Sequence, residues 1–187
     1  MTEPRKRKTR ILRWMLFAGV PVVVAGLALA FFVLRADPVD TGPTLFIIQR
    51  SKNANEVHYE VQVNADGALA DEPVIAYWVL KAESGGREDL SFFERKMAYG
   101  FEVLPPDSSG DREMKLVAWE DRTIRLTKSK DSGKWRAATT IDGERAYLTR
   151  LYIETDESGL TPTVLHIDLF GETVDGGDPV RERVVKE

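Results

Sequence analysis

An uncharged stretch of 21 residues near the N-terminus, Trp14–Leu34, most constrains what this chain can fold into. At a rise of about 1.5 Å per residue, a helix of this length covers about 32 Å, enough to cross the hydrocarbon core of a bilayer. Six cationic residues precede it, in the cluster Arg5–Lys8 and at Arg10 and Arg13. Because cationic flanks stay in the cytoplasm, we expect a single-pass membrane protein with a cytoplasmic N-terminus and a periplasmic or extracellular C-terminal part.

The competing interpretation of this segment is a cleaved secretory signal. Signal peptides have apolar cores of about 7–15 residues and a small-x-small cleavage site. Ala28-Leu29-Ala30 fits such a site, but cleavage there would leave the apolar Phe31–Leu34 as the new N-terminus. The length of the apolar run favours a retained signal anchor, and the chain has no cysteine to carry a lipid anchor instead.

One folded domain is expected after the membrane segment. Residues 35–43 hold two prolines and no apolar pattern, which is typical of a short extended linker. The 144 residues that follow are enough for a single domain with a sizeable core. The expected organisation is a basic cytoplasmic segment at 1–13, a transmembrane helix at 14–34, a linker at 35–43 and an extracytoplasmic β domain at 44–187.

Charge is distributed unevenly between these segments. Residues 1–35 carry a net charge of +6 and the whole chain −4, so residues 36–187 carry −10. An acidic domain repels phosphate backbones and anionic lipid head groups, which argues against nucleic-acid and peripheral lipid binding. The absence of cysteine excludes disulfides, thiolate zinc sites and thiol catalysis, so the domain must be stable through its core alone.

Period-two alternation dominates the sequence after residue 44. In residues 56–63, four apolar side chains alternate with Glu56, His58, Glu60 and Gln62, and a turn is predicted directly afterwards. Val74–Leu80 is apolar on both faces, as expected for a central strand that is covered on both sides. Further strands are predicted at Met114–Trp119, Thr123–Leu126, Trp135–Ile141, Arg145–Ile153 and Thr163–Phe170.

Turn residues separate these strands at short intervals. Asp142-Gly143 is the sharpest signal, because a type I′ hairpin needs two positive φ angles and Asp-Gly supplies them at low cost. A final hairpin is predicted from Thr163–Thr173, a turn at Asp175–Asp178, and Val180–Val185. Regular short strands with tight turns favour a mostly β fold, an antiparallel meander closing as a barrel or a sandwich. The other predicted turns are Asn64–Gly67, Glu120–Arg122, Asp131–Gly133 and Glu157–Gly159.

One short helix interrupts the strand pattern. Ser91 and Glu94 have the spacing of a capping box, and Gly100 is a natural stop. A helix is therefore predicted over Ser91–Tyr99, bracing or plugging one end of the sheet. The alternation also predicts a set of buried side chains: Val57, Tyr59, Val61, Trp78, Leu126, Leu165, Ile167 and Leu169.

The two histidines are weak candidates for chemistry. His58 and His166 each have a carboxylate two residues on, Glu60 and Asp168, on the same strand face. Neighbouring strands would make this a metal or acid–base site, but solvated side chains on polar strand faces are the more common case. No catalytic, phosphate-binding or dinucleotide motif is present, so we expect no catalytic residue, metal or cofactor.

The connection Arg50–Asn55 and the aromatic helix are the better candidates for a site. Arginine, lysine and asparagine side chains donate the hydrogen bonds that hold a carboxylate or phosphate. The alternative is an ordinary turn with Asn53 or Asn55 in the left-handed conformation. If the connection meets the helix, Trp78 or Tyr99 could stack beneath the ligand, unless Glu94 pairs with an arginine and merely braces the helix. The candidate ligand-binding residues are Arg50, Lys52, Asn53, Asn55, Trp78, Glu94, Arg95 and Tyr99.

Four stretches together resemble a known family: Arg50–Asn55 before an alternating strand, Tyr77–Leu80, Phe93–Gly100 and Asp168–Gly171. They are similar to a bacterial domain-of-unknown-function family of exported or membrane-anchored proteins, over nearly all of residues 44–187. The resemblance implies an extracytoplasmic bacterial protein with the same mostly β fold. It transfers no activity, substrate or catalytic residue.

Three classes of function follow. The first is a non-catalytic cell-envelope module that binds a partner protein or a cell-wall component. The second is a barrel that binds a small anionic ligand with an apolar body. The third, a hydrolase-like enzyme, is least favoured because no catalytic signature is present.

Overall fold

The computed structural model describes residues 43–83, 85–159 and 163–185. The cytoplasmic segment predicted at 1–13, the transmembrane helix predicted at 14–34 and all but the last residue of the linker predicted at 35–43 lie outside the described residues. Among the helices of the described residues, none has the length and apolar character needed to cross a bilayer. The fold is therefore that of the domain predicted from residue 44 onward.

Strands make up 65% of the described residues, which confirms the prediction of a mostly β domain. One short α-helix, α1 (Phe92–Met97), and one 3₁₀ turn, η1 (Lys81–Glu83), interrupt them in this part of the chain. The strands are β1 (Thr44–Arg50), β2 (Asn53–Val63), β3 (Leu69–Leu80), β4 (Gly86–Asp89), β5 (Phe101–Val103), β6 (Arg112–Leu116), β7 (Trp119–Lys128), β8 (Trp135–Ile141), β9 (Glu144–Asp156), β10 (Thr163–Thr173) and β11 (Pro179–Val185).

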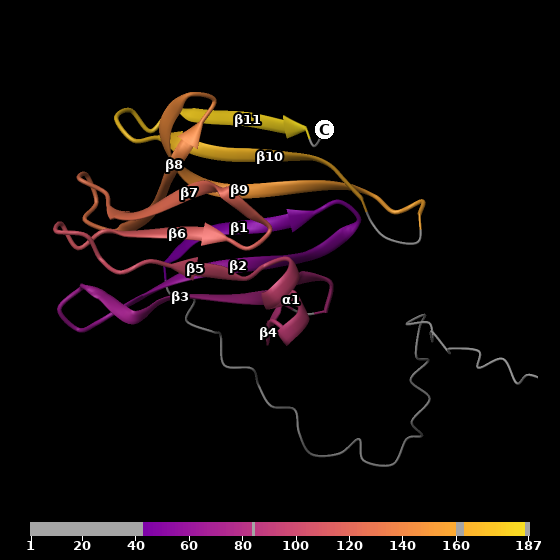
Figure 1. Cartoon of the computed structure of the whole chain (residues 1–187), viewed down its shortest axis with the longest axis horizontal. Helices are drawn as coiled ribbons and strands as arrows, with labels where there is room; N and C mark the ends of the chain where they lie inside the picture. Colours follow the sequence, from indigo (N-terminus) through magenta and orange to yellow (C-terminus); the bar gives the residue numbers. More distant parts are fainter. Residues whose placement is uncertain (1–42, 84, 160–162, 186–187) are drawn as a thin grey trace, which may run out of the picture. The chain divides into compact units, whose positions relative to one another are not determined.

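These strands form one curled sheet with two arms that meet at β9 (Figure 1). One arm has the order β4-β3-β2-β1 and the other the order β5-β6-β7-β8. β8 pairs with the first part of β9, β1 pairs with its second part, and β10 pairs along most of its length and carries β11. Because β4 and β5 end the path through the described strands without pairing to each other, the sheet is a half-barrel and not a closed barrel or a sandwich.

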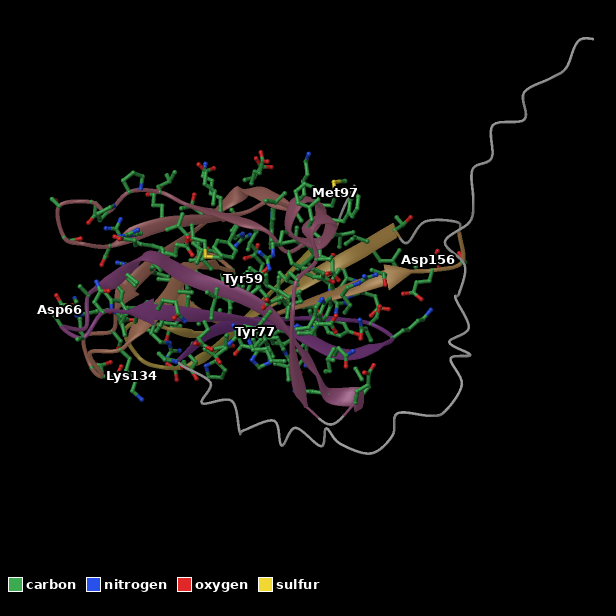
Figure 2. The ribbon with its side chains drawn as sticks, turned by 90° about the horizontal axis from the view of Figure 1, so that it is seen from below. Tyr59, Asp66, Tyr77, Met97, Lys134 and Asp156 are labelled. Atoms are coloured by element: carbon green, nitrogen blue, oxygen red, sulfur yellow. The ribbon has the colours of Figure 1, made fainter. Side chains whose placement is uncertain are left out.

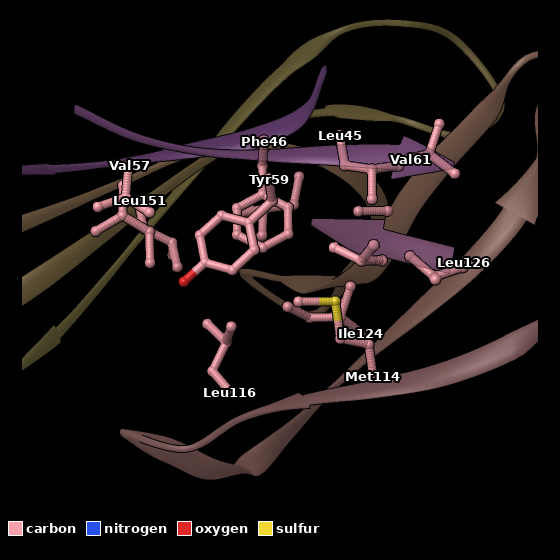
Figure 3. Close-up of a cluster of buried hydrophobic side chains, with 14 of the residues drawn as sticks. Leu45, Phe46, Val57, Tyr59, Val61, Met114, Leu116, Ile124, Leu126 and Leu151 are labelled. Atoms are coloured by element: carbon pink, nitrogen blue, oxygen red, sulfur yellow. The ribbon is translucent and has the colours of Figure 1, made fainter. Parts of the chain in front are cut away.

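The hydrophobic core fills the space between the two arms (Figure 3). Phe46 and Tyr59 stack with ring centroids 4.4 Å apart, and Tyr59 packs edge-on against Phe101 of the other arm. Fully burying one side chain of this size stabilises the fold by about 2 kcal/mol. Core residues come from both arms and from β9 and β10: Leu45, Val57, Val61, Met114, Leu116, Ile124, Leu126, Leu148, Leu151 and Leu169.

Three local predictions are confirmed. Asp142 and Gly143 both have positive φ angles, 52° and 81°, and join β8 to β9 as a tight hairpin. β10 and β11 form the final antiparallel hairpin. Ser91 caps α1 and, with Glu94, forms the complete capping box, so the helix begins where its sequence signal lies.

Two predictions about the sheet are wrong. The meander is not purely antiparallel, because β1 runs parallel to β9, with Ile48 opposite Leu151. Two strands that pair in parallel and lie far apart in the sequence are not joined by a tight turn, so no turn residues in the sequence indicate their pairing. Val74–Leu80 does not lie in a central strand, since β3 is next to the end of its arm and only the short β4 lies beyond it.

Two predictions about turns are also wrong. Residues 120–122 lie inside β7, and the turn that joins β6 to β7 is at residues 117–118. Within β7, Arg122 pairs with Glu182 of β11 at 2.7 Å, and its guanidinium lies over the ring of Trp119. In the β1–β2 connection Lys52, with φ 60°, takes the left-handed conformation that we expected of Asn53 or Asn55.

The predicted buried set is largely correct. Val57, Tyr59, Val61, Leu126 and Leu169 are buried, and Trp78 and Ile167 are half-buried against the core. The prediction that Leu165 is buried is wrong, because 46% of its surface is exposed. The register of β10 shifts between Val164 and His166, so the side chain of Leu165 loses the inward phase of Ile167 and Leu169.

Candidate functional site

A cleft of about 490 Å³ lies where the two arms leave the half-barrel open. Its walls are the first part of β3 on one side, and β5 and the turn after β6 on the other. Leu90, Tyr99 and Gly100 lie at its α1 end, and Asp71 and Arg112 line it as well. A volume of this size is within the range of small-molecule and cofactor sites.

The wall formed by β3 presents unpaired backbone groups to the cleft. Val61 of β2 donates its N–H to the carbonyl of Pro43, on the β1 side, so Val61 and the facing Val74 are not bonded to each other. The N–H and carbonyl of Val74 therefore point away from β2, and those of Ala76, two residues on, point the same way. β4 covers residues 77–80 of this edge, and its pairing directs the Ala76 carbonyl toward the N–H of Leu90, the residue after β4. The N–H and carbonyl of Val74 and the N–H of Ala76 therefore have no described strand partner on the cleft side.

The wall formed by β5 has the same property. Val117 donates its N–H to the carbonyl of Gly100, and Leu104 donates to the carbonyl of Glu113. Gly100 and Leu104 thus point toward β6, and the residues between them in the alternate phase, Phe101 and Val103, point away from it. In the described chain only β6 pairs with β5, so these backbone groups also face the cleft.

Three arginines line the cleft without an ion pair to any described carboxylate. The guanidinium of Arg87 lies 3.7 Å from the ring centroid of Tyr77. Arg95 donates from Nε to the carbonyl of Leu90 at 2.9 Å, and Arg112 donates from one terminal nitrogen to the carbonyl of Asp71 at 3.3 Å. The Nε of Arg112 is buried and has no hydrogen-bond partner among the described residues. Such a donor is costly to leave empty and suits an acceptor supplied by a ligand.

The α1 end of the cleft is rigidly held. The Glu94 carboxylate accepts hydrogen bonds from the Ser91 backbone N–H at 2.8 Å and from Trp78 Nε1 at 3.0 Å. Burial acts to raise the pKa of Glu94, but these donors together lower it below its usual value. The ring of Trp78 packs edge-on against Tyr99, whose carbonyl accepts the hydroxyl of the buried Tyr59 at 2.7 Å.

Gly100 is required by the close approach of the chain after α1. A Cβ at this position would lie 1.7 Å from the carbonyl oxygen of Arg95 and 3.2 Å from the side chain of Val117. Glycine therefore lets the backbone turn from α1 directly into β5. This turn fixes the distance between the helix and the β5 wall of the cleft.

The structure brings together five of the eight candidate residues. Trp78, Glu94 and Tyr99 are in contact, and Arg95 and Tyr99 line the cleft. Arg50 lies near Tyr99: burial raises the pKa of Tyr99, and the neighbouring Arg50 guanidinium opposes that rise. Glu94 hydrogen-bonds to Trp78 and the Ser91 backbone, whereas Arg50 lies 4.0 Å from Glu157.

The remaining candidates lie on the β1–β2 turn, away from the cleft. Asn53 accepts the backbone N–H of Asn55, which in turn accepts the N–H of Ala82 and ties this turn to η1. Lys52 is exposed at the tip of the turn. These three side chains shape a turn and do not line the cleft.

The two histidine–carboxylate pairs do not form a joint site, because β1 and β9 separate β2 from β10. His58 lies 3.1 Å from Glu56 and not beside Glu60. His166 lies 3.7 Å from Asp168, a buried carboxylate that Arg181 and Arg183 bind at 2.8 and 2.7 Å. Hydrogen bonds from Arg183 and Arg181 hold the pKa of Asp168 well below its usual range. Within the described residues, no group of three or more His, Cys, Asp or Glu side chains is placed to hold a metal ion.

Sequence reasoning missed Arg87, Arg112 and both strand edges. These arginines come from separate strands, and neither has a distinctive sequence neighbourhood. One signal was available, because Pro73 lies within β3. Proline in a strand indicates an edge position or a bulge, and this residue lies where β3 bulges away from β2, between its pairings at Leu69 and Val74, and lines the cleft.

Fold and site together define a small half-barrel domain with a cleft between two unpaired strand edges. The chain belongs to the family described as Domain of unknown function (DUF4833), which matches residues 46–183. The expected membership of a domain-of-unknown-function family is thereby confirmed over nearly all of the predicted domain. No curated protein and no solved structure matches the chain.

Proposed function

We propose that this protein is a non-catalytic binding module of a bacterial cell envelope, held at the membrane by residues 14–34 with the half-barrel outside the cytoplasm. The anchor is supported by the uncharged 21-residue run and the cations before it. The binding role is carried by one observation, the cleft between β3 and β5 with its unpaired backbone edges. The partner is a protein or cell-wall component of the envelope.

Binding is favoured over catalysis by the chemistry of the cleft. Its described lining includes carboxylates and arginines but no histidine, serine or cysteine. A serine or cysteine nucleophile with an adjacent histidine base is therefore missing from these walls. Asp168 and Glu94 already accept hydrogen bonds from donors of their own chain.

A second candidate function is the binding of a small ligand with a carboxylate and an apolar body. The arginines without ion pairs favour it, because a carboxylate would satisfy the buried Nε of Arg112. Tyr99 and Phe101 offer apolar surface in the same cleft. Both functions use the same walls, so one experiment tests whether the cleft binds anything.

The test is thermal unfolding of the full chain with acidic peptides and with soluble muramyl-peptide fragments of cell wall. A ligand at about one hundred times its Kd raises the free energy of unfolding by about 2.7 kcal/mol. Val103→Trp should fill the cleft and abolish that shift, whereas Val184→Trp, half-buried on β11, should keep it. A shift that survives Val103→Trp would place binding elsewhere and refute the proposal.

Topology is tested separately with a reporter fused after Glu187. The fusion should be active only with a reporter that works outside the cytoplasm. Activity of a cytoplasmic reporter would overturn the envelope location and leave the binding site untouched.

A further inference from the structure

We infer that the ligand of the cleft is an extended polypeptide segment of a partner protein, which adds as a strand between β3 and β5 and closes the half-barrel. The inference rests on the proposed binding function and names the class of its ligand. Its basis is the pair of unpaired edges that face one cleft from opposite sides. Proteins with such edges bind extended peptides by main-chain hydrogen bonds and select side chains with pockets.

Both walls of the cleft present backbone N–H and carbonyl groups that point toward the position of the added strand. Val74 on β3, and Phe101 and Val103 on β5, each direct an N–H and a carbonyl into the cleft, and Ala76 directs its N–H there. An added strand also has N–H and carbonyl groups that alternate between its two sides. It therefore satisfies β3 with one set of residues and β5 with the other, which a compact small molecule does not do.

The walls also specify the side chains of the added strand. Val74, Ala76, Phe101 and Val103 direct their side chains to the interior, where the last three pack against the core. Residues of the added strand that share their phase enter the same apolar space. Every second residue of the segment is therefore apolar, as in a half-buried strand.

Charge favours an acidic segment. Arg95 and the half-buried Arg112 line the cleft without ion pairs to described carboxylates, and the Nε of Arg112 lacks any described acceptor. Asp71, Glu72 and Asp89 also line the cleft, but these three acids are exposed, as is Arg95, so the charge of the more buried part comes from Arg112. A carboxylate on the segment meets Arg112 in the more buried part of the cleft, where a charge-assisted hydrogen bond is strongest.

Apolar surface continues from the cleft onto α1, which indicates a partner larger than the cleft itself. Phe92, Phe93 and Met97 are 70%, 75% and 71% exposed, and Val117, which lines the cleft, is 39% exposed. Figure 2 shows Met97 projecting away from the sheet. Exposed apolar clusters of this kind mark protein interaction surfaces. A protein that inserts a strand beside α1 can cover these side chains with the residues that flank the strand.

The test uses a panel of fluorescent pentapeptides in which Val, Ile, Leu or Phe alternates with Glu, measured by anisotropy with the full chain in detergent. The best binder is then compared with the same peptide N-methylated at its alternate backbone nitrogens. This modification keeps every side chain and charge but removes the N–H donors on one side, and its methyl groups block the close approach of a strand there. We expect N-methylation to weaken binding by about tenfold or more.

Two variants and amide exchange complete the experiment. Ala76→Pro removes an N–H that faces the cleft and should weaken the parent peptide about tenfold. Val185→Pro, at the free outer edge of β11, is the matched control and should leave affinity unchanged. The bound peptide should slow exchange at Val74, Ala76, Phe101 and Val103 together. This exchange measurement uses the unmodified chain, so it holds even if Ala76→Pro fails to fold.

The outcomes separate this inference from the proposed function. Equal binding of the N-methylated peptide, or no binding by any panel member while muramyl fragments still bind, overturns strand addition and leaves the cleft a small-ligand site. Protection of the four amides in the free chain means that the chain itself or a second copy occupies the cleft, and it also overturns the inference. If neither peptides nor muramyl fragments bind, both the strand-addition inference and the proposed binding function are wrong.

Discussion

Arginines and carboxylates meet in two regions of this domain, and the two regions differ in how completely the charges are paired. On the outer face of β10 and β11, Asp168 is 3% exposed and accepts hydrogen bonds from both Arg181 and Arg183. In the cleft, Arg87, Arg95 and Arg112 lie near backbone carbonyls and an aromatic ring, without an ion pair among the described residues.

The two regions therefore hold two kinds of charged group: those that stabilise the fold and those that remain available to a ligand. A carboxylate that already accepts several hydrogen bonds from its own chain has no acceptor site left for a ligand, and removing it destabilises the fold. Arginines without carboxylate partners can be removed at little cost to the fold, but their removal harms binding. Variants in both regions test this distinction, and they are ordered here by the size of the expected effect.

Gly100→Ala should have the largest effect, because it moves the α1 end of the cleft. The new methyl group would lie 1.7 Å from the Arg95 carbonyl, so α1 and β5 must separate. Overpacking of this kind costs about 1–3 kcal/mol of unfolding free energy, measured by urea denaturation. Gly86→Ala is the control, since no atom lies within 4 Å of the corresponding position. Equal stability of the two variants would show that α1 does not depend on this contact.

Asp168→Asn should cost about 2 kcal/mol, the lower part of the range for charged hydrogen bonds, because both arginines are half exposed. The arginines lower the pKa of Asp168 in the folded protein, so its ionised form stabilises the fold above about pH 4, the usual aspartate pKa. That stabilisation is lost as the pH falls from there toward the lowered value. The variant should therefore lose less stability than the wild type between pH 5 and 2, as followed by thermal unfolding. An unchanged acid profile would contradict the assignment of this cluster as structural.

Ser91→Ala should cost about 1 kcal/mol, the usual effect of losing an N-cap. It removes the hydroxyl that accepts the Glu94 N–H at 3.3 Å, while the Trp78–Glu94 hydrogen bond remains. Hydrogen exchange should become faster in α1 and stay constant in β10 and β11. Faster exchange in both regions would mean that the helix supports the whole sheet and not only the end of the cleft.

Arg112→Met should have the smallest effect on stability, within about 0.5 kcal/mol of the wild type, because it removes a buried Nε that has no described partner. Its effect should appear in peptide binding instead. Arg183→Met is the matched variant, since it strips Asp168 of two hydrogen bonds and should lower the Tm without changing binding. If Arg112→Met lowers the Tm as much as Arg183→Met does, the cleft arginine is structural and the contrast between the regions disappears.

Much of the fold follows from local sequence signals. Asp142-Gly143, the Ser91–Glu94 capping box and the last hairpin are all determined by residues close together in the chain. The turn at residues 117–118 was missed because Val117 and Ala118 are not turn residues, whereas the charged residues 120–122 resemble a turn but lie in β7. The parallel pairing of β1 with β9 depends on tertiary contacts, for which the sequence has no local marker.

The site was predictable only where it is local. The aromatic helix and Trp78 carry a composition signal, and the structure places them together at one end of the cleft. Arg112 and the edges of β3 and β5 carry none. Whether a strand edge is paired depends on which strands are its neighbours, and that is a property of the complete sheet.

The pairing of β1 with β9 also determines when the domain can finish folding. Ser51 and Thr155, which share a hydrogen bond just beyond the paired strands, are separated by 104 residues of sequence. Long-range pairing of this kind raises contact order and slows folding, because a large loop must close before the contacts form. Until β9 has been synthesised, the first strand of the domain has a partner on one side only. The sheet is therefore complete only late in synthesis, and a chain truncated before β9 leaves one edge of β1 unpaired.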